Sequence, residues 1–190
     1  ISNSLFGQQP CSTAQASCLE QANGNDANGV EISDELLQLV LNFNRNIGVP
    51  KRRRPKAEKV LAGRELFYQI GCQQCHQPDF ITMVSSERPH LGEQHIWPYS
   101  DFLLHDMGEQ LADHRPDYQA SGREWRTAPL WGLGLSQQIS GSRNFLHDGR
   151  ARSIEEAILW HGGEASDSQQ AFTQLSLQQR QQLLSFVRSL

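Results

Sequence analysis

The sequence predicts an all-α fold, because its regular segments carry apolar residues at helical spacing. Such faces occur over residues 34–46, 56–70 and 177–190. Ser33 is a suitable N-cap for the first of these segments, and Ser176 with Gln179 fits a capping box before the last. Residues 77–152 are rich in His, Pro, Gly and Trp and have no long amphipathic period, so we expect loops and short helices there.

The remaining helices are predicted from caps and stop signals. Ser153 begins a helix that runs to residue 160 or 161, and Ser166 begins a short one that reaches residue 174. Gly63 lies inside the helix over residues 56–70, where glycine costs about 1 kcal/mol relative to alanine. A glycine is useful there if a second helix crosses closely, and we expect that partner to be the C-terminal helix.

Composition narrows the class of protein. The 190 residues are 37% hydrophobic and 20% charged, with a net charge of −4 and a pI near 6.0. These values do not suggest a nucleic-acid partner. No apolar run approaches the ~20 residues needed to span a bilayer, so we expect no membrane span. The sequence begins at Ile1 without a signal peptide, so we expect a mature or trimmed product.

Cys72, Cys75 and His76 form a Cys-x-x-Cys-His motif, the attachment signature of c-type haem. Two thiols at this spacing project from one side of a helical turn, so both can reach the vinyl groups of one porphyrin. The next residue then places an imidazole beneath the iron. The motif predicts one covalent haem c, with Cys72 and Cys75 as thioether anchors and His76 as proximal ligand.

Two other uses of the cysteine pair remain open. A redox dithiol normally follows a strand and begins a helix, whereas the residues before Cys72 look helical. A zinc site could combine the pair with Cys11 and Cys18, but the spacing between those two is wider than in a usual zinc ligand pair. The histidine directly after Cys75 favours haem over both alternatives.

Residues 1–32 predict a loop-rich extension with a Cys11–Cys18 disulfide. Disulfides persist in oxidising compartments, and covalent haem attachment also occurs outside the bacterial cytoplasm. Both features favour a periplasmic or extracytoplasmic location. The Asn-rich run over residues 23–29 could supply oxygen ligands to calcium, but it does not match an EF-hand loop, so solvated turns are the preferred interpretation.

Met107 is the candidate sixth ligand of the haem iron. It lies 31 residues after His76, which is enough chain to reach the far face of a porphyrin, whereas Met83 is too close. The alternatives are a histidine or an open, water-bound iron. The rival histidines are His90, His95, His105 and His114. His/Met ligation raises the reduction potential and favours electron transfer.

The helix before the haem motif and the Leu-rich C-terminal helix resemble the class I cytochrome c fold. Beyond it, three stretches together resemble the carboxy-terminal haem domain of the di-haem oxidoreductases, often labelled thiol oxidoreductases. These enzymes are relatives of the bacterial di-haem cytochrome c peroxidases. The stretches are Tyr99–Gly108, Glu124–Gly132 and Phe145–Arg150, continuing through Ser153–Ile158. They are specific as a set and weak individually.

This resemblance implies a His/Met haem that relays electrons to a second haem, which reacts with peroxide. It matches His76 and Met107 to the ligand pair and His147–Arg150 to a loop near the haem. The family has two Cys-x-x-Cys-His motifs and this chain has one, so a second haem domain or redox partner protein is expected. Trp97, Trp125 and Trp131 are candidates for a route between haems, although large aromatic residues more often serve packing.

The sequence therefore predicts residues 1–32 as an extension and residues 33–190 as a class I cytochrome c-like haem domain. The expected function is single-electron transfer within a peroxidase-like oxidoreductase, without catalysis by this domain alone. The alternative is a pentacoordinate haem peroxidase acting on hydrogen peroxide, with His105 or Glu109 as acid–base group. A third possibility is a binding module without haem, held by zinc or by the disulfide.

Overall fold

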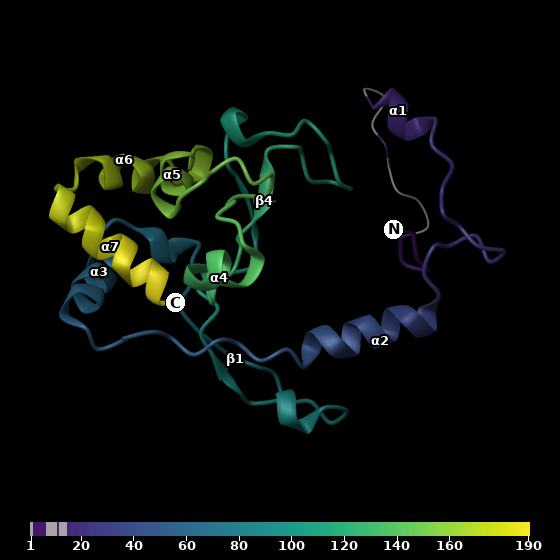
Figure 1. Ribbon diagram of the computed structural model, residues 1–190, viewed down its shortest axis with the longest axis horizontal. Coiled ribbons are helices and arrows are strands. Elements are labelled where there is room, and N and C mark those ends of the chain that lie inside the picture. Colours follow the sequence, from purple (N-terminus) through teal and green to yellow (C-terminus); the bar gives the residue numbers. More distant parts are fainter. Residues whose placement is uncertain (1, 7–10, 12–14) are drawn as a thin grey trace. The chain divides into compact units, whose positions relative to one another are not determined.

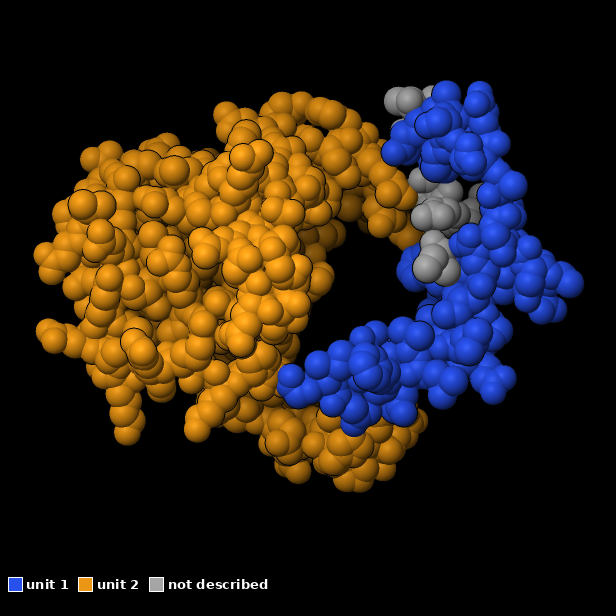
Figure 2. All heavy atoms as spheres, in the orientation of Figure 1, with its two compact units in different colours: residues 1–48 blue, residues 49–190 orange. Residues whose placement is uncertain are grey.

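The computed structural model describes residues 2–6, 11 and 15–190. The chain forms two compact units, Ile1–Gly48 and Val49–Leu190 (Figure 2). The sequence-based division instead assigns the segment 33–48 to the haem domain. That division stays a prediction, because compactness alone does not show which residues a haem domain needs.

The first unit contains helices α1 (Ala16–Leu19) and α2 (Asp34–Arg45). The Ser33 side chain caps α2 by accepting a hydrogen bond from the Leu36 N–H. The predicted Cys11–Cys18 disulfide is confirmed. In the Asn-rich run, the Asp26 side chain accepts hydrogen bonds from the backbone and side chain of Asn28, so this part of the run forms a turn.

The second unit is built on the packing of α3 (Glu58–Gln69) against α7 (Leu177–Ser189), which lie side by side in Figure 1. A Cβ atom at Gly63 would overlap the Gln182 carbonyl of α7. The predicted close crossing at this glycine is therefore confirmed. The most buried side chains of this core are Phe67, Phe172, Leu183 and Phe186.

Helices α5 (Ile154–Leu159) and α6 (Ser166–Gln174) complete the helical part of this core, and α4 (Ser136–Ser140) is a short helix before them. Ser153 caps α5 by accepting from the Glu156 N–H, while Ser176 and Gln179 form the predicted capping box of α7. No helix in the described part of the chain is long and apolar enough to cross a membrane.

Two small antiparallel sheets correct the predicted fold class. Strands β1 (Phe80–Ile81) and β2 (His95–Ile96) pair with Phe80 opposite Ile96. Strands β3 (Leu104–Asp106) and β4 (Glu124–Arg126) pair with His105 opposite Trp125. The prediction of an all-α, class I cytochrome c-like fold is wrong, and the protein is mixed α/β. Strands of two or three residues are too short to show the alternation by which a strand is recognised.

Candidate functional site

The Cys-x-x-Cys-His motif lies in a turn at the end of α3. Gly71 has φ +88° and ends the helix in the left-handed region, which glycine adopts without steric cost. Cys72–Gln74 then form a 3₁₀ turn, in which residues three apart eclipse one another. The His76 N–H donates to the Cys72 carbonyl at 2.9 Å. This local geometry places Cys72 and Cys75 in one turn and His76 directly after them.

The two thiols of this turn are free and partly buried. Burial raises the pKa of Cys72 to about 12, and it is also the main cause of the raised pKa of Cys75. Nucleophilic and redox-active cysteines have lowered pKa values, so these surroundings do not favour a redox dithiol. The four-cysteine zinc site is excluded because Cys11 and Cys18 are joined to each other.

The imidazole of His76 is held as a neutral base. Its Nδ1 lies 2.9 Å from the Tyr99 carbonyl oxygen, so Nδ1 carries the proton and donates it to this bond. Burial lowers the pKa of His76 to about 4, and the ring is therefore neutral at pH 7. The lone pair of Nε2 is left available to a metal ion, which is the arrangement found around metal-bound histidines.

The Tyr99 carbonyl is positioned by the segment after β2. Tyr99 is 3% exposed and has φ +53°, a conformation that is strained for a bulky residue and persists only where packing enforces it. Its ring meets Phe67 and Phe186 edge-on, with centroids 5.9 and 5.7 Å away. The next two residues also bond back to this part of the chain: the Ser100 N–H donates to the Gln77 carbonyl at 2.9 Å and the Asp101 N–H to the Cys75 carbonyl at 2.8 Å.

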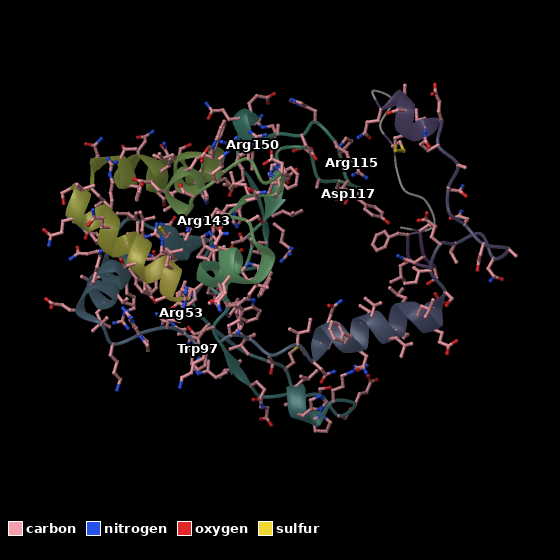
Figure 3. The ribbon with its side chains drawn as sticks, viewed as in Figure 1. Arg53, Trp97, Arg115, Asp117, Arg143 and Arg150 are labelled. Atoms are coloured by element: carbon pink, nitrogen blue, oxygen red, sulfur yellow. A yellow bond between two sulfur atoms is a disulfide. The ribbon has the colours of Figure 1, made fainter. Side chains whose placement is uncertain are left out.

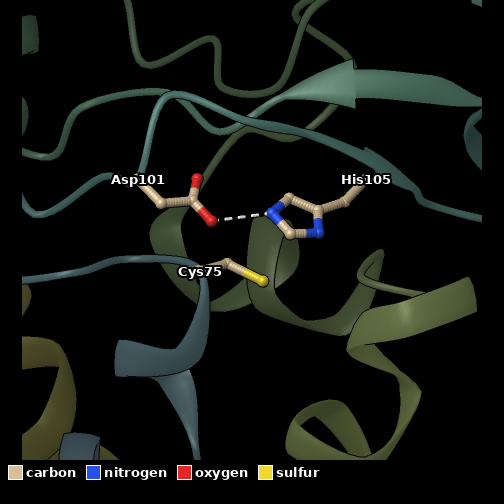
Figure 4. Close-up of side chains that lie close together, drawn as sticks. All are labelled: Cys75, Asp101 and His105. Carbon is tan, nitrogen blue, oxygen red and sulfur yellow. Dashed lines mark hydrogen bonds and ion pairs between the residues drawn. The ribbon is translucent and has the colours of Figure 1, made fainter.

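Next to this turn lies a polar cluster of Cys75, Asp101 and His105 (Figure 4). His105 Nε2 lies 2.8 Å from Asp101 and its Nδ1 lies 2.9 Å from Glu164. The hydrogen bond to Glu164 is the main cause of the raised pKa of His105. Both ring nitrogens are thus engaged by carboxylates, and His105 is poorly suited to bind iron.

Met107, the predicted sixth ligand, directly follows β3 and is partly buried. Its N–H donates to the Arg123 carbonyl at 2.9 Å, and its carbonyl oxygen would lie 3.0 Å from a Cβ added at Gly162. Met107 as an iron ligand stays a prediction. Met83, which the sequence disfavoured, is 88% exposed.

His161 is a residue that the sequence analysis missed. It follows α5, and its ring centroid lies 6.4 Å from that of His76. The histidines considered from sequence as alternative sixth ligands all lie between the haem motif and residue 115. The signal that was available is the Gly162-Gly163 pair directly after a predicted helix end, because adjacent glycines allow close approach of another backbone.

His95, His114 and Glu109 form ion pairs with residues outside the haem motif. His95 pairs with Asp79 at 2.5 Å, and its ring centroid lies 4.1 Å from that of Trp97 with the planes inclined by 37°. His114 and Glu109 are exposed and 3.6 Å apart. His90 lies in the exposed 3₁₀ turn Pro89–Leu91. None of these contacts places the side chain against His76.

The tryptophans named from sequence occupy two places. Trp97 and Trp131 line a cavity of about 320 Å³ that contains no residue of the haem motif. Trp125 stacks on His147 with ring centroids 3.4 Å apart and donates from Nε1 to the Leu111 carbonyl. Arg150, labelled with Trp97 in Figure 3, pairs with Asp148 and lies over the Trp160 ring. An electron route through the tryptophans and a place near the haem for the His147–Arg150 loop stay predictions.

Comparison with known families matches residues 9–190 to the family described as "Di-haem oxidoreductase, putative peroxidase". Comparisons with curated proteins and with solved structures gave no match. The family implies a haem cofactor, a peroxidase-like redox role and a second haem domain. The chemistry of the site fits a haem, since two free thiols and a neutral imidazole lie in one turn. Because the match covers nearly the whole sequence, the chain belongs to the di-haem oxidoreductase family.

Proposed function

We propose that this chain holds one haem covalently through Cys72 and Cys75, with His76 as an axial ligand, and transfers single electrons. The observation that carries the proposal is the hydrogen bond from His76 Nδ1 to the Tyr99 carbonyl. It selects the tautomer with a free Nε2, and it does so in the same turn as two free thiols. A bound haem would supply a one-electron change between ferrous and ferric iron.

The chain's own residues support this role in three ways. The raised pKa values of the two cysteines keep the thiols protonated, so both sulfurs carry the hydrogen that is added across a vinyl group when a thioether forms. The Tyr99 carbonyl fixes the orientation of the His76 ring and raises its basicity as a ligand. Phe67, with its ring 6.5 Å from that of His76, supplies apolar surroundings.

The electron partner is a second haem domain or a separate redox protein. The family implies a second haem domain, and this chain contains one Cys-x-x-Cys-His motif. In this arrangement the present chain relays electrons and the second haem reacts with peroxide. The Cys11–Cys18 disulfide supports a periplasmic or extracytoplasmic site of action.

The test is whether the full chain carries haem that survives denaturation. We expect a Soret band and a mass increase of one haem in the parent chain. After denaturation, the double variant Cys72→Ala, Cys75→Ala should show neither the Soret band nor the mass increase. Gln74→Ala is the matched control, because Gln74 is exposed in the same turn and should leave attachment intact. A parent chain that binds no haem would overturn the proposal.

A second candidate function, peroxide reduction at an open haem of this chain, is favoured by one observation. His105 lies between Asp101 and Glu164 with a raised pKa, beside the cysteine that would anchor the haem. Such a histidine can supply a proton at pH 7. This function predicts hydrogen peroxide turnover by the haem-loaded chain with a one-electron donor, falling at least 100-fold in His105→Gln. Electron transfer without peroxide turnover would reject it.

A further inference from the structure

Two imidazole rings lie close together in the second unit. His76 belongs to the turn after α3, and His161 follows α5, 85 residues later in the sequence. Their ring centroids are 6.4 Å apart and their planes are inclined by 44°. Both residues are partly buried.

The two rings are also anchored in the same way. His76 Nδ1 donates to the Tyr99 carbonyl at 2.9 Å, and His161 Nδ1 donates to the Ala157 carbonyl at 2.7 Å. The carbonyls belong to different elements, the segment after β2 and helix α5. In each ring the nitrogen left with a lone pair is therefore Nε2, which lies across the ring from the anchoring carbonyl.

The separation of the rings matches that of two imidazoles sharing one metal ion. A metal–imidazole bond is about 2.0–2.1 Å, with zinc as the measure, and a five-membered ring with bonds of about 1.33 Å has a radius of about 1.1 Å. Ligands on opposite sides of one ion then have centroids about 6.2–6.5 Å apart. The observed 6.4 Å lies inside this range.

We propose that His161 is the second axial ligand of the haem iron, opposite His76. This inference rests on the proposed function, because it requires the haem that Cys72 and Cys75 would hold. It replaces Met107, the ligand predicted from sequence. The contacts described for Met107 are made by its backbone, with Arg123 and beside Gly162. The ring of His161, in contrast, lies at the distance from the His76 ring that two ligands of one metal ion would have.

Close backbone packing fixes the position of His161. A Cβ at Gly163 would overlap the Asp106 carbonyl, and a Cβ at Gly108 would lie 3.0 Å from the Gly163 N. Gly162 and Gly163 thus let the chain after His161 lie directly against the segment that carries Met107. His161 and Met107 are close enough to be rivals for one position, and the test must separate them.

The choice of ligand changes the electron chemistry. Two histidines close both axial positions, so peroxide cannot reach the iron without loss of a ligand. Methionine opposite histidine raises the reduction potential, so a second histidine in its place gives a lower one. Bis-histidine ligation assigns this haem to electron relay at lower potential than the His/Met pair would give.

The experiment records absorption and electron paramagnetic resonance spectra of the haem-loaded full chain and its variants. The parent should be low-spin and lack the weak near-infrared band that marks sulfur bound to ferric iron. His161→Ala should become high-spin, and added imidazole should restore the low-spin spectrum. His161→Met should gain the near-infrared band and show a raised potential. Met107→Ala should keep the parent spectrum, as should the matched control His114→Ala, whose ring is exposed.

The outcomes test the His161 assignment separately from the proposed covalent haem. A chain without haem overturns the proposed function. A haem-loaded parent that shows the sulfur band, and loses it in Met107→Ala, overturns the assignment of His161 but leaves the haem proposal intact. If His161→Ala fails to fold, the parent, His161→Met and Met107→Ala spectra decide the question. A low-spin His161→Met variant without the sulfur band also counts against His161.

Discussion

His76 and His105 lie in adjoining parts of the second unit, yet their surroundings favour opposite protonation states. His76 has one backbone carbonyl as partner and packs near Phe67, so its pKa falls to about 4. His105 lies between the Asp101 and Glu164 carboxylates, which raise its pKa. Apolar surroundings therefore keep His76 neutral and able to bind a metal ion. Carboxylate surroundings favour the protonated form of His105, which can act as a cation or as an acid.

Among the variants considered, Phe67→Ala should have the largest effect on stability and on the difference in pKa between His76 and His105. Phe67 is 2% exposed and contacts Tyr99 and Phe186. Its loss should lower the free energy of unfolding by about 3–5 kcal/mol. In a haem-free chain, the pKa of His76 should rise toward its ordinary value because burial is what lowers it, while that of His105 should not move. Denaturant unfolding and NMR titration measure the two effects.

Tyr68→Ala is the matched control for this prediction, since Tyr68 is the neighbouring aromatic residue on α3 and is 39% exposed. It should cost less than half as much stability. An unchanged His76 pKa in Phe67→Ala would show that burial by this ring is not the cause of the shift.

Gly63→Val tests whether the α3–α7 packing supports the His76 side. The new side chain would meet the Gln182 carbonyl and Phe186 Cβ, so the free energy of unfolding should fall by about 2–3 kcal/mol. Gly48→Val, at a position with no atom within 4 Å of a Cβ, should change it by only about 0.5 kcal/mol. Equal effects in thermal unfolding would contradict the close crossing.

Ser153→Ala tests the support of His161. The Ser153 side chain caps α5, and loss of an N-cap costs about 1 kcal/mol. Ser153→Thr keeps a capping hydroxyl and should recover most of the stability. Chemical unfolding of both variants gives the comparison, and a Thr variant as unstable as the Ala variant would argue against the cap.

The smallest effect is expected from Glu164→Gln on the polar side. Because the pKa of His105 is raised in the folded chain, its carboxylate contacts stabilise the fold below the ordinary histidine pKa of about 6.5. That stability is lost as the pH rises through the raised value. Glu164→Gln should lower the pKa of His105 and flatten this pH dependence without altering His76. An NMR titration in which the His105 resonance does not shift would contradict the assignment.

The helices could be predicted from sequence because their signals are local. The segment predicted over 56–70 is α3 at Glu58–Gln69, and that over 177–190 is α7 at Leu177–Ser189. Caps such as Ser153 and Ser176 act within three residues of the helix start. The strands could not be predicted, because β3 and β4 gain their hydrogen bonds from a partner about twenty residues away rather than from a pattern within either strand.

The same distinction applies to the candidate site. The Cys-x-x-Cys-His motif could be read because its residues are contiguous, and the Cys11–Cys18 disulfide because its spacing is short. The nearness of His161 to His76 depends on how α5 packs in the second unit. The local Gly162-Gly163 pair indicates a close backbone contact but does not say which residue lies there. The opposite surroundings of His76 and His105 likewise come from Tyr99 and Glu164, which lie far along the chain from each.

The crossing of α3 and α7 also bears on the order of events as the protein is made. More than one hundred residues separate Gln69 of α3 from Leu177 of α7, and contacts of such long range form late because a large loop must close first. Before folding, α3 therefore lacks its main partner. The turn carrying Cys72 and Cys75 stays on an unsupported helix until α7 packs against it, so the two cysteines are more accessible for haem attachment before folding than after it.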